Sequence, residues 1–302
     1  MKGPGRTVLQ TPSTSAKLWS MFRFRSLPVL PLLVALALPR ASAGAQEVAK
    51  GGAQGVAVRP APLVTRGDLL VLGVGAGLAV LAQRSDLSVR ARVRSAGAQA
   101  NGTLGTLADV GNAWGGSVSL LTGAGLWAGG RAAGRPTATV VGFRAVEAIT
   151  VSGLITKALK AGFGRARPRV DSLDPWNVEF GRGWDNDHES FPSGHSTAAF
   201  AFAAAVTSEV LHRAPARARL VGTTTFALAG VTAYARMHSD AHWLSDVTMG
   251  AAIGMASGWA VARWHRTRPD NRIDATVLGR MSPLVVQGPQ GRTLVGATIA
   301  WR

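Results

Sequence analysis

The residues best suited to chemistry lie in three short stretches, each expected at the end of a helix. In the first, Lys160 is followed by Arg167 and Pro168, with two glycines between them. Gly162 and Gly164 permit a sharp turn, the proline stops a helix from continuing, and the arginine offers a planar fork that matches phosphate oxygens. Alone, the stretch is typical of an ordinary helix C-terminus, where basic residues complement the helix dipole.

The second stretch reads Phe-Pro-Ser-Gly-His-Ser over residues 191–196 and precedes an alanine-rich apolar run. Free backbone N–H groups at a helix start form an anion site. Gly194 lets the backbone approach a ligand closely, Ser193 adds a hydroxyl donor, and His195 can transfer a proton near neutral pH. Alone, it is equally typical of a serine-capped helix with an incidental histidine.

The third stretch begins at Arg236 and continues to His242 and Asp246. If a helix begins near Asp240, the histidine and the aspartate share one face, four positions apart. The carboxylate then holds one ring nitrogen as N–H and leaves the other free to attack phosphorus. Structural His–Asp pairs are common, so this stretch is also only suggestive by itself.

Together, the three stretches resemble the phosphatidic acid phosphatase type 2 / haloperoxidase superfamily, whose pattern is Lys-x6-Arg-Pro, then Pro-Ser-Gly-His, then Ser-Arg-x5-His-x3-Asp. Their order and internal spacing all agree with this pattern. The one departure is Ala235, where the family usually has serine, which puts one peripheral hydrogen bond in doubt. The resemblance spans about residues 69–264 and is carried by residues 160–246.

The resemblance implies a role for each matched residue. His242 is the nucleophile, Asp246 orients it, and His195 protonates the leaving oxygen. The residues implied to bind phosphate are Lys160, Arg167, Ser193, Gly194 and Arg236. Three cations and backbone dipoles can supply by fixed electrostatics what a metal ion supplies elsewhere, so we expect no metal and no cofactor.

We therefore expect a metal-independent phosphatase that hydrolyses a lipid (pyro)phosphate or a phosphomonoester through a phosphohistidine intermediate. One alternative is a vanadate-dependent haloperoxidase, which holds vanadate with the same residues but is usually much longer and has additional peroxide and halide residues. A second is a non-catalytic basic envelope protein that binds anionic lipid, although the complete set of polar positions argues against it. The three stretches do not choose among phosphate substrates.

An all-α bundle of about six helices, of the type found in this superfamily, is expected to position these stretches. The predicted helices are residues 69–82, 104–127, 139–160, 197–211, 219–235 and 242–264. Thr65 and Asp68 resemble a capping box that opens the first helix. Residues 281–287 and 293–301 flank Gly-Pro-Gln-Gly and predict a short C-terminal β-hairpin.

Whether these helices span a membrane stays open. Most uninterrupted apolar runs are shorter than the roughly 20 residues that a span needs. Arg144 and Glu147 interrupt the third helix, where they must pair inward at their i,i+3 spacing if lipid surrounds it. These features favour a bundle that is not deeply embedded.

The composition limits the classes of molecule that we expect the protein to bind. The 302 residues include no cysteine, which excludes a disulfide framework and thiolate metal sites, and carry a formal net charge of +17. Such an excess attracts nucleic acid, an anionic membrane surface or phosphorylated substrates. No nucleic-acid motif is present, so we expect a phosphorylated lipid or small-molecule phosphate as the partner, with a membrane surface nearby.

The N-terminus resembles an export signal. Arg23 and Arg25 precede an apolar run over residues 27–38 and small-residue cleavage sites. We expect residues 1–45 to be a signal peptide, with Met21 as a possible true start, and an uncleaved anchor is the alternative. The predicted parts that follow are a linker at residues 46–66, a phosphatase domain at 67–266 and a β tail at 267–302. This places the protein in the cell envelope on the periplasmic side, soluble or membrane-associated.

Overall fold

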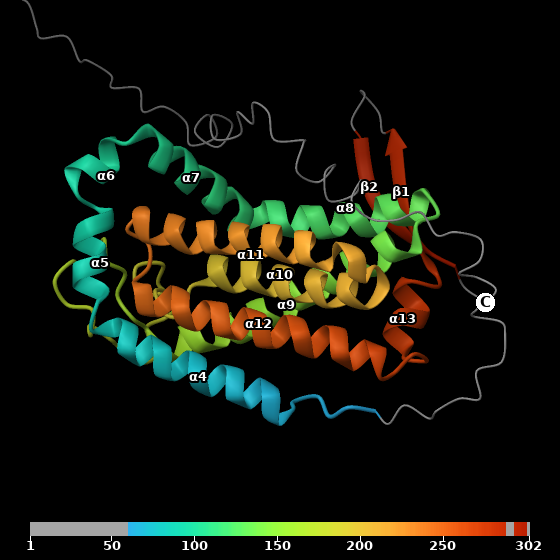
Figure 1. Ribbon diagram of the computed structural model, residues 1–302, viewed down its shortest axis with the longest axis horizontal. Helices are drawn as coiled ribbons and strands as arrows, with labels where there is room; N and C mark the ends of the chain where they lie inside the picture. The colour runs from blue at the N-terminus through green and yellow to red at the C-terminus, as the bar shows by residue number, and fades with distance from the viewer. Residues whose placement is uncertain (1–59, 288–292, 301–302) are drawn as a thin grey trace, which may run out of the picture.

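The computed structural model describes residues 60–287 and 293–300. Long helices lie side by side along most of the molecule, and Figure 1 shows α10 surrounded by its neighbours. The long elements are α4 (Arg66–Gln83), α7 (Gly102–Ala113), α8 (Ser119–Ala132), α9 (Pro136–Phe163), α10 (Gly194–Arg213), α11 (Pro215–His238) and α12 (Leu244–Arg266). Shorter elements are α5 (Asp86–Val93), α6 (Ala96–Ala100), the π-helical turn η1 (Trp114–Val118), α13 (Arg272–Val277), β1 (Met281–Gln287) and β2 (Thr293–Ile299). The predicted signal peptide, and the predicted linker up to residue 59, lie outside the described residues.

The predicted fold class is confirmed, because the described chain is mostly helical and ends in a two-stranded sheet. β1 and β2 pair antiparallel from Met281 opposite Ile299 to Gln287 opposite Thr293. The structure differs from the expectation in detail. The helix expected over residues 104–127 is divided by η1, where Gly116 leaves helical geometry with φ −84° and ψ −114°. The short helices α5, α6 and α13 were not predicted.

Small residues build the core around α10, which packs against α9, α11 and α12. Its alanines at positions 199, 201, 203, 204 and 205 are fully buried. Two large buried side chains, Phe202 of this helix and Trp114 of η1, meet edge to face with ring centroids 5.1 Å apart. Because alanine side chains are short, the helix axes can approach closely and hold their ends in a fixed relation.

Three glycines on one face of α12 allow it to lie directly against α10. A Cβ atom at Gly250, Gly254 or Gly258 would stand 2.6, 2.4 or 2.6 Å from a backbone oxygen of α10 or its cap. These distances leave no room for a side chain, so backbone contact fixes how the start of α12 lies against the start of α10.

The predicted capping box at the start of α4 is confirmed. Asp68 N donates to Thr65 Oγ1 at 3.3 Å, and Thr65 N donates to Asp68 Oδ2 at 2.7 Å. The same carboxylate accepts two hydrogen bonds from Arg263 near the end of α12. One aspartate thus caps α4 and ties it to α12.

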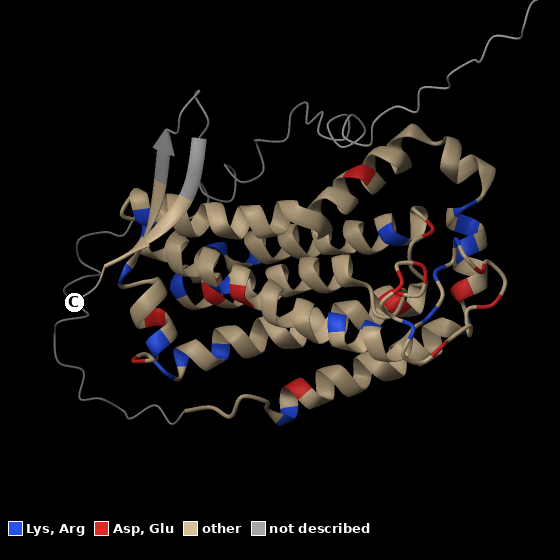
Figure 2. Ribbon diagram, turned by 180° about the vertical axis from the view of Figure 1, so that it is seen from behind, with Lys and Arg blue, Asp and Glu red and all other residues tan. Residues whose placement is uncertain are grey.

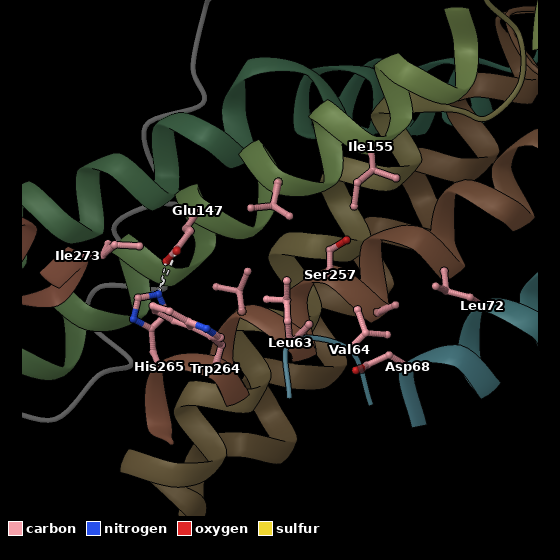
Figure 3. Close-up of a pocket in the computed structure, with 14 residues that line it drawn as sticks. Leu63, Val64, Asp68, Leu72, Glu147, Ile155, Ser257, Trp264, His265 and Ile273 are labelled. Atoms are coloured by element: carbon pink, nitrogen blue, oxygen red, sulfur yellow. Dashed lines mark hydrogen bonds and ion pairs between the residues drawn. The ribbon is translucent and has the colours of Figure 1, made fainter. Parts of the chain in front are cut away.

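Lys, Arg, Asp and Glu gather toward the two ends of the bundle, and few of them lie between (Figure 2). At one end, the expected inward pair of Arg144 and Glu147 is present, with 3.6 Å between Nη1 and Oε2. His265 contacts both Glu147 and Asp274. Figure 3 shows His265 and Glu147 at one end of a cavity, whose volume is about 420 Å³. Most of its other lining residues are apolar, and Asp68 and Ser257 are the polar ones.

Within the described part of the chain, α4 and α9 are long and apolar enough to cross a membrane, judged by length and composition alone. Most of α4 is exposed: Leu70, Val80 and Leu81 each show more than half of their surface. Mostly buried core helices of soluble proteins also meet this criterion, and α9 is more buried than α4.

Candidate active site

Helix direction brings the three stretches to one end of the bundle. There α9 and α11 end, and α10 and α12 begin, on the left of Figure 1. Ser193 N, at the N-cap of α10, donates to Asp246 O at 3.1 Å, so the second and third stretches are joined through their backbones. A Cβ atom on Gly194 would stand 3.9 Å from Lys160 Cε, which places the first stretch against the second.

His242 and Asp246 face each other at this end, but they do not share a helix. The expectation of a helix beginning near Asp240 is wrong, because Asp240 adopts a positive φ of 56° and α12 begins only at Leu244. The backbone N–H groups of Ala241 and His242 both donate to Arg236 O, which closes the turn after α11. The four-residue spacing still works, since the turn leaves His242 Nδ1 3.6 Å from Asp246 Oδ2.

Asp246 is fully buried and accepts short hydrogen bonds on both oxygens. Arg165 Nη1 donates to Oδ1 at 2.5 Å, while Ser190 Oγ and Trp243 N donate to Oδ2 at 2.6 and 2.8 Å. Burial by itself raises the pKa of this carboxyl, but the charge of Arg165 and the hydrogen bonds outweigh it and hold the pKa well below its usual range. The carboxylate is therefore ionised and fixed in orientation at neutral pH.

His242 is held neutral. Burial lowers its pKa well below the ordinary value, and the charges of Lys160 and Arg167 act in the same direction against the opposing effect of Asp246. Its Nδ1 faces the carboxylate, so Nε2 is the nitrogen left for attack. A neutral imidazole with one nitrogen directed by a carboxylate is the form that a nucleophile requires.

Lys160 and Arg167 are buried basic residues held by the loop that follows α9, and a bound phosphate would favour the protonated form of Lys160. Lys160 Nζ donates to the Glu189 carbonyl, and burial with the nearby charge of Arg167 lowers the Lys160 pKa to about 7. Arg167 donates to Asn186 O at 2.6 Å and to Ala241 O at 3.3 Å. The loop can turn back here because Gly164, with φ +57°, ends α9 in the left-handed conformation.

Arg236 is the third cation, near the end of α11. Its Nη1 donates to Asn112 Oδ1 at 2.7 Å, whereas its Nε is buried and has no hydrogen-bond partner among the described residues. Burial and the charge of Arg167 lower its pKa to about 10, which leaves it protonated at neutral pH. A buried cationic N–H without a partner beside two further cations fits an anionic ligand such as phosphate.

His195 lies in the first turn of α10, against η1. A Cβ on Gly116 would stand 3.6 Å from His195 Nε2, so the irregular turn leaves space beside the imidazole. Burial and the charges of Arg236, Arg167 and Lys160 lower the pKa of His195 to about 4. A bound phosphate would offset those three charges and raise the pKa, which is the direction that a general acid needs.

All eight residues singled out from the sequence therefore lie at one end of the bundle. Four further residues support them and were not singled out: Asp86, Asn112, Arg165 and Ser190. Arg165 lies within the first stretch and Ser190 directly before the second, but nothing in their local spacing marks them. Asp86 and Asn112 come from α5 and α7, and only the fold brings them to the site.

An apolar cavity of about 590 Å³ opens beside the site, between α4, α9, α12 and the loop before α10. Its walls include Ala79, Val80, Leu159, Phe163 and Phe191. Arg165 and Ser245, which contact the Asp246 network, also line it. Apolar volume thus adjoins the Arg165 and Ser245 side of the Asp246 network.

Comparisons with known proteins agree with this geometry. A sequence profile of the PAP2 superfamily matches residues 142–270, which contain all eight site residues. A protein described as lipid A 1-phosphatase, from Porphyromonas gingivalis, is 30% identical over 110 residues, or 36% of this chain and 20% of that protein. The chain therefore matches only about a fifth of the length of this curated relative.

A solved structure shares the fold. The transmembrane PAP2 type phosphatidylglycerolphosphate phosphatase from Bacillus subtilis aligns with a TM-score of 0.51 over 68% of this chain and 96% of that one. The sequences are 19% identical in this alignment, so the likeness speaks for the fold alone.

Proposed function

The chain belongs to the PAP2 superfamily, and on that premise we propose that it is a lipid phosphate phosphatase that works through a phosphohistidine on His242. The observation that carries the proposal is that His242 Nδ1 lies 3.6 Å from the buried Asp246 carboxylate, next to the buried Lys160 and Arg167 and the half-buried Arg236. The cations would bind the phosphoryl oxygens together with Ser193 and Gly194.

In the proposed first step, His242 Nε2 attacks phosphorus while the bond from phosphorus to the leaving oxygen breaks. The electron pair stays on that oxygen, which takes the proton of His195. In the second step, water attacks the phosphohistidine, His195 accepts a proton from that water, and inorganic phosphate leaves as His242 is regenerated. The fixed cations are worth most as negative charge shifts to the leaving oxygen.

A lipid substrate is favoured by the surroundings of the site. The apolar cavity of about 590 Å³ opens near the site, with Arg165 and Ser245 of the Asp246 network in its lining, and would receive part of an acyl chain. The exposed apolar face of α4 suits contact with lipid, and the relative from Porphyromonas gingivalis is described as a lipid A 1-phosphatase. We propose residues 67–266 as the phosphatase domain with residues 267–302 as a β tail, exported behind a signal peptide and associated with the periplasmic side of a membrane.

Phosphate release from a panel of substrates tests the proposal. The panel comprises phosphatidate, undecaprenyl pyrophosphate, lipid A and p-nitrophenyl phosphate. The wild-type chain should release phosphate from at least one lipid faster than from the soluble ester, and His242→Ala should abolish release. Halide oxidation with added vanadate and peroxide, in the absence of phosphate release, would instead identify a haloperoxidase.

The two histidines can be separated by the leaving group. His195→Ala should slow release of an alkoxide leaving group by about 10²–10⁴-fold, as for loss of a general acid. It should slow release of p-nitrophenolate much less, because that group hardly needs a proton. Rapid-quench labelling should place phosphate on the peptide that contains His242; label on the His195 peptide would overturn the assignment.

A further inference from the structure

A buried network extends from Asp246 away from the phosphate site and ends at Asp86 on α5. Arg165 lies between them and contacts both carboxylates: Nη1 donates to Asp246 Oδ1 at 2.5 Å, and Nη2 donates to Asp86 Oδ2 at 2.9 Å. Both carboxyl side chains are fully buried, and the arginine side chain is 4% exposed. Solvent therefore screens these interactions little.

Every contact that reaches Asp86 comes from a donor. Ser245 N donates to Oδ1 at 2.9 Å, and Ser245 Oγ donates to Oδ2 at 2.6 Å, beside the bond from Arg165. The Ser245 hydroxyl can donate because it accepts from Arg165 Nη1 at 2.8 Å. The backbone N–H of Ser245 and the guanidinium of Arg165 can only donate, so these contacts favour the ionised form of Asp86. Burial raises the pKa of Asp86 above its ordinary value, and the hydrogen bonds from Ser245 and the charge of Arg165 offset this effect only in part.

The net charge of this network determines whether Asp246 can act as a counter-charge for His242. Asp86, Arg165 and Asp246 together carry one net negative charge. If Asp86 were neutral, Arg165 would cancel the charge of Asp246, and His242 would face a pair with no net charge. Formation of a bond from His242 Nε2 to phosphorus makes the imidazole cationic, and a net negative charge behind it stabilises that state.

We propose that Asp86 is a positioning residue of this site, which acts through Arg165 to keep Asp246 available as the counter-charge of His242. The inference rests on the proposed function. It adds to the site a residue from α5, which lies outside the segment that matches the family profile. Asp86 touches neither substrate nor His242.

The charged groups around His242 set the sign of the expected effect. Lys160 from α9 and Arg167 from the following loop lower its pKa, and Asp246 from α12 raises it. Asp86→Asn removes one negative charge behind Asp246, so the pKa of His242 should fall further. Arg165→Gln removes the positive charge instead, so that pKa should rise. A purely structural role for the network gives no reason for opposite shifts.

The experiment measures kcat, KM and the pH profile of kcat/KM for p-nitrophenyl phosphate with the full-length chain. The acidic limb depends on both His242, which must be neutral to attack, and ionisation of the substrate. Because the pKa of His242 is already low, its titration is also followed directly by NMR of the imidazole in each variant. In Asp86→Asn, kcat and the rapid-quench rate of phosphoenzyme formation should fall by about tenfold or more, while KM changes little. The limb should move to lower pH by about one unit.

Asp68→Asn is the matched control. Asp68 is also buried, also accepts from a serine or threonine hydroxyl and a backbone N–H, and also pairs with an arginine, Arg263, at the other end of the bundle. It should show a comparable loss of thermal stability and the wild-type pH profile. The double variant Asp86→Asn/Arg165→Gln restores the net charge, so its limb should return toward that of the wild type. If Arg165→Gln does not fold, the comparison of Asp86→Asn with Asp68→Asn carries the test.

Two outcomes would overturn this inference and leave the proposed function standing. One is an active wild-type chain whose profile is unchanged in Asp86→Asn. The other is a loss of kcat in Asp86→Asn without a shift of the limb, matched by Asp68→Asn. A wild-type chain that releases no phosphate from any substrate would instead defeat the proposed function, and this inference with it.

Discussion

Arg236 Nη1 donates a hydrogen bond to Asn112 Oδ1 at 2.7 Å, although 124 positions separate the two residues in the chain. The amide oxygen comes from the last turn of α7, just before η1. It holds a guanidinium whose Nε has no hydrogen-bond partner among the described residues. Arg236, a proposed phosphate ligand, is therefore held by a helix that contains none of the three sequence stretches.

The first prediction concerns this contact. Asn112→Ala should weaken inhibition by vanadate, a mimic of five-coordinate phosphorus, by about tenfold, since a hydrogen bond to a charged group contributes roughly 1.5–3 kcal/mol. Inhibition constants measured with p-nitrophenyl phosphate check this. Asp109→Ala, at an exposed position of the same helix, is the control and should bind vanadate as the wild type does. Equal affinity in both variants would show that Arg236 is oriented without Asn112.

The second prediction concerns the glycine face of α12. Gly254→Ala should destabilise the fold by about 1–3 kcal/mol, because its Cβ would stand 2.4 Å from Thr197 O and force α10 and α12 apart. Gly153→Ala in α9 is the matched control. No atom lies within 4 Å of its added Cβ, so this change should stabilise the helix by about 0.5–1 kcal/mol. Urea unfolding measures both, and a neutral Gly254→Ala would contradict the close approach.

The third prediction concerns pH and the cluster at the far end of the bundle. Burial lowers the pKa of His265, but its contacts with Asp274 and Glu147 outweigh burial and raise the pKa above the ordinary value. A group whose pKa is raised on folding stabilises the fold below its unfolded pKa, and the contribution disappears as pH rises through the folded pKa. His265→Gln should therefore lower the Tm more at pH 5.5 than at pH 9. Thermal scans at both pH values decide it, and an equal loss at both would exclude a charged His265.

The fourth prediction concerns metal ions. Lys160, Arg167 and Arg236 already supply positive charge at the proposed phosphate site, so phosphate release should persist in EDTA. Vanadate should inhibit with and without the chelator. Assays of dialysed protein with EDTA, and then with added magnesium, measure this. Activity that disappears in EDTA and returns with magnesium would mean that a metal ion takes part in the step.

The long helices were predictable because their apolar runs and capping residues are local signals. Thr65 and Asp68 illustrate this, since three positions of sequence suffice to recognise the capping box. The turn before His242 was not predictable in the same way. Asp240 adopts a left-handed conformation that sequence alone does not require, and it is held by the bidentate contact of Arg90 with its carboxylate.

The eight candidate site residues could be named from motif spacing, but their supporting residues could not. Arg165 is two positions before Arg167 and has an equally basic side chain, yet one is turned toward Asp246 and the other toward Asn186 and Ala241. Which arginine meets which carbonyl or carboxylate depends on how the loop closes after Gly164. Asp86 and Asn112 meet the site only through long-range packing, for which a single sequence offers no signal.

If Asp86 and Asn112 have the proposed roles, the segment that matches the family profile does not contain the whole site. Residues 142–270 carry every motif residue, but α5 and α7 precede that segment. Recombination between relatives that exchanged this segment alone would pair a foreign carboxylate and a foreign amide, or neither, with Arg165 and Arg236. Chimeras that keep α4 to α8 together with α9 to α12 preserve both pairings. The segment that must be kept together for the proposed chemistry is therefore longer than residues 142–270, which match the family profile.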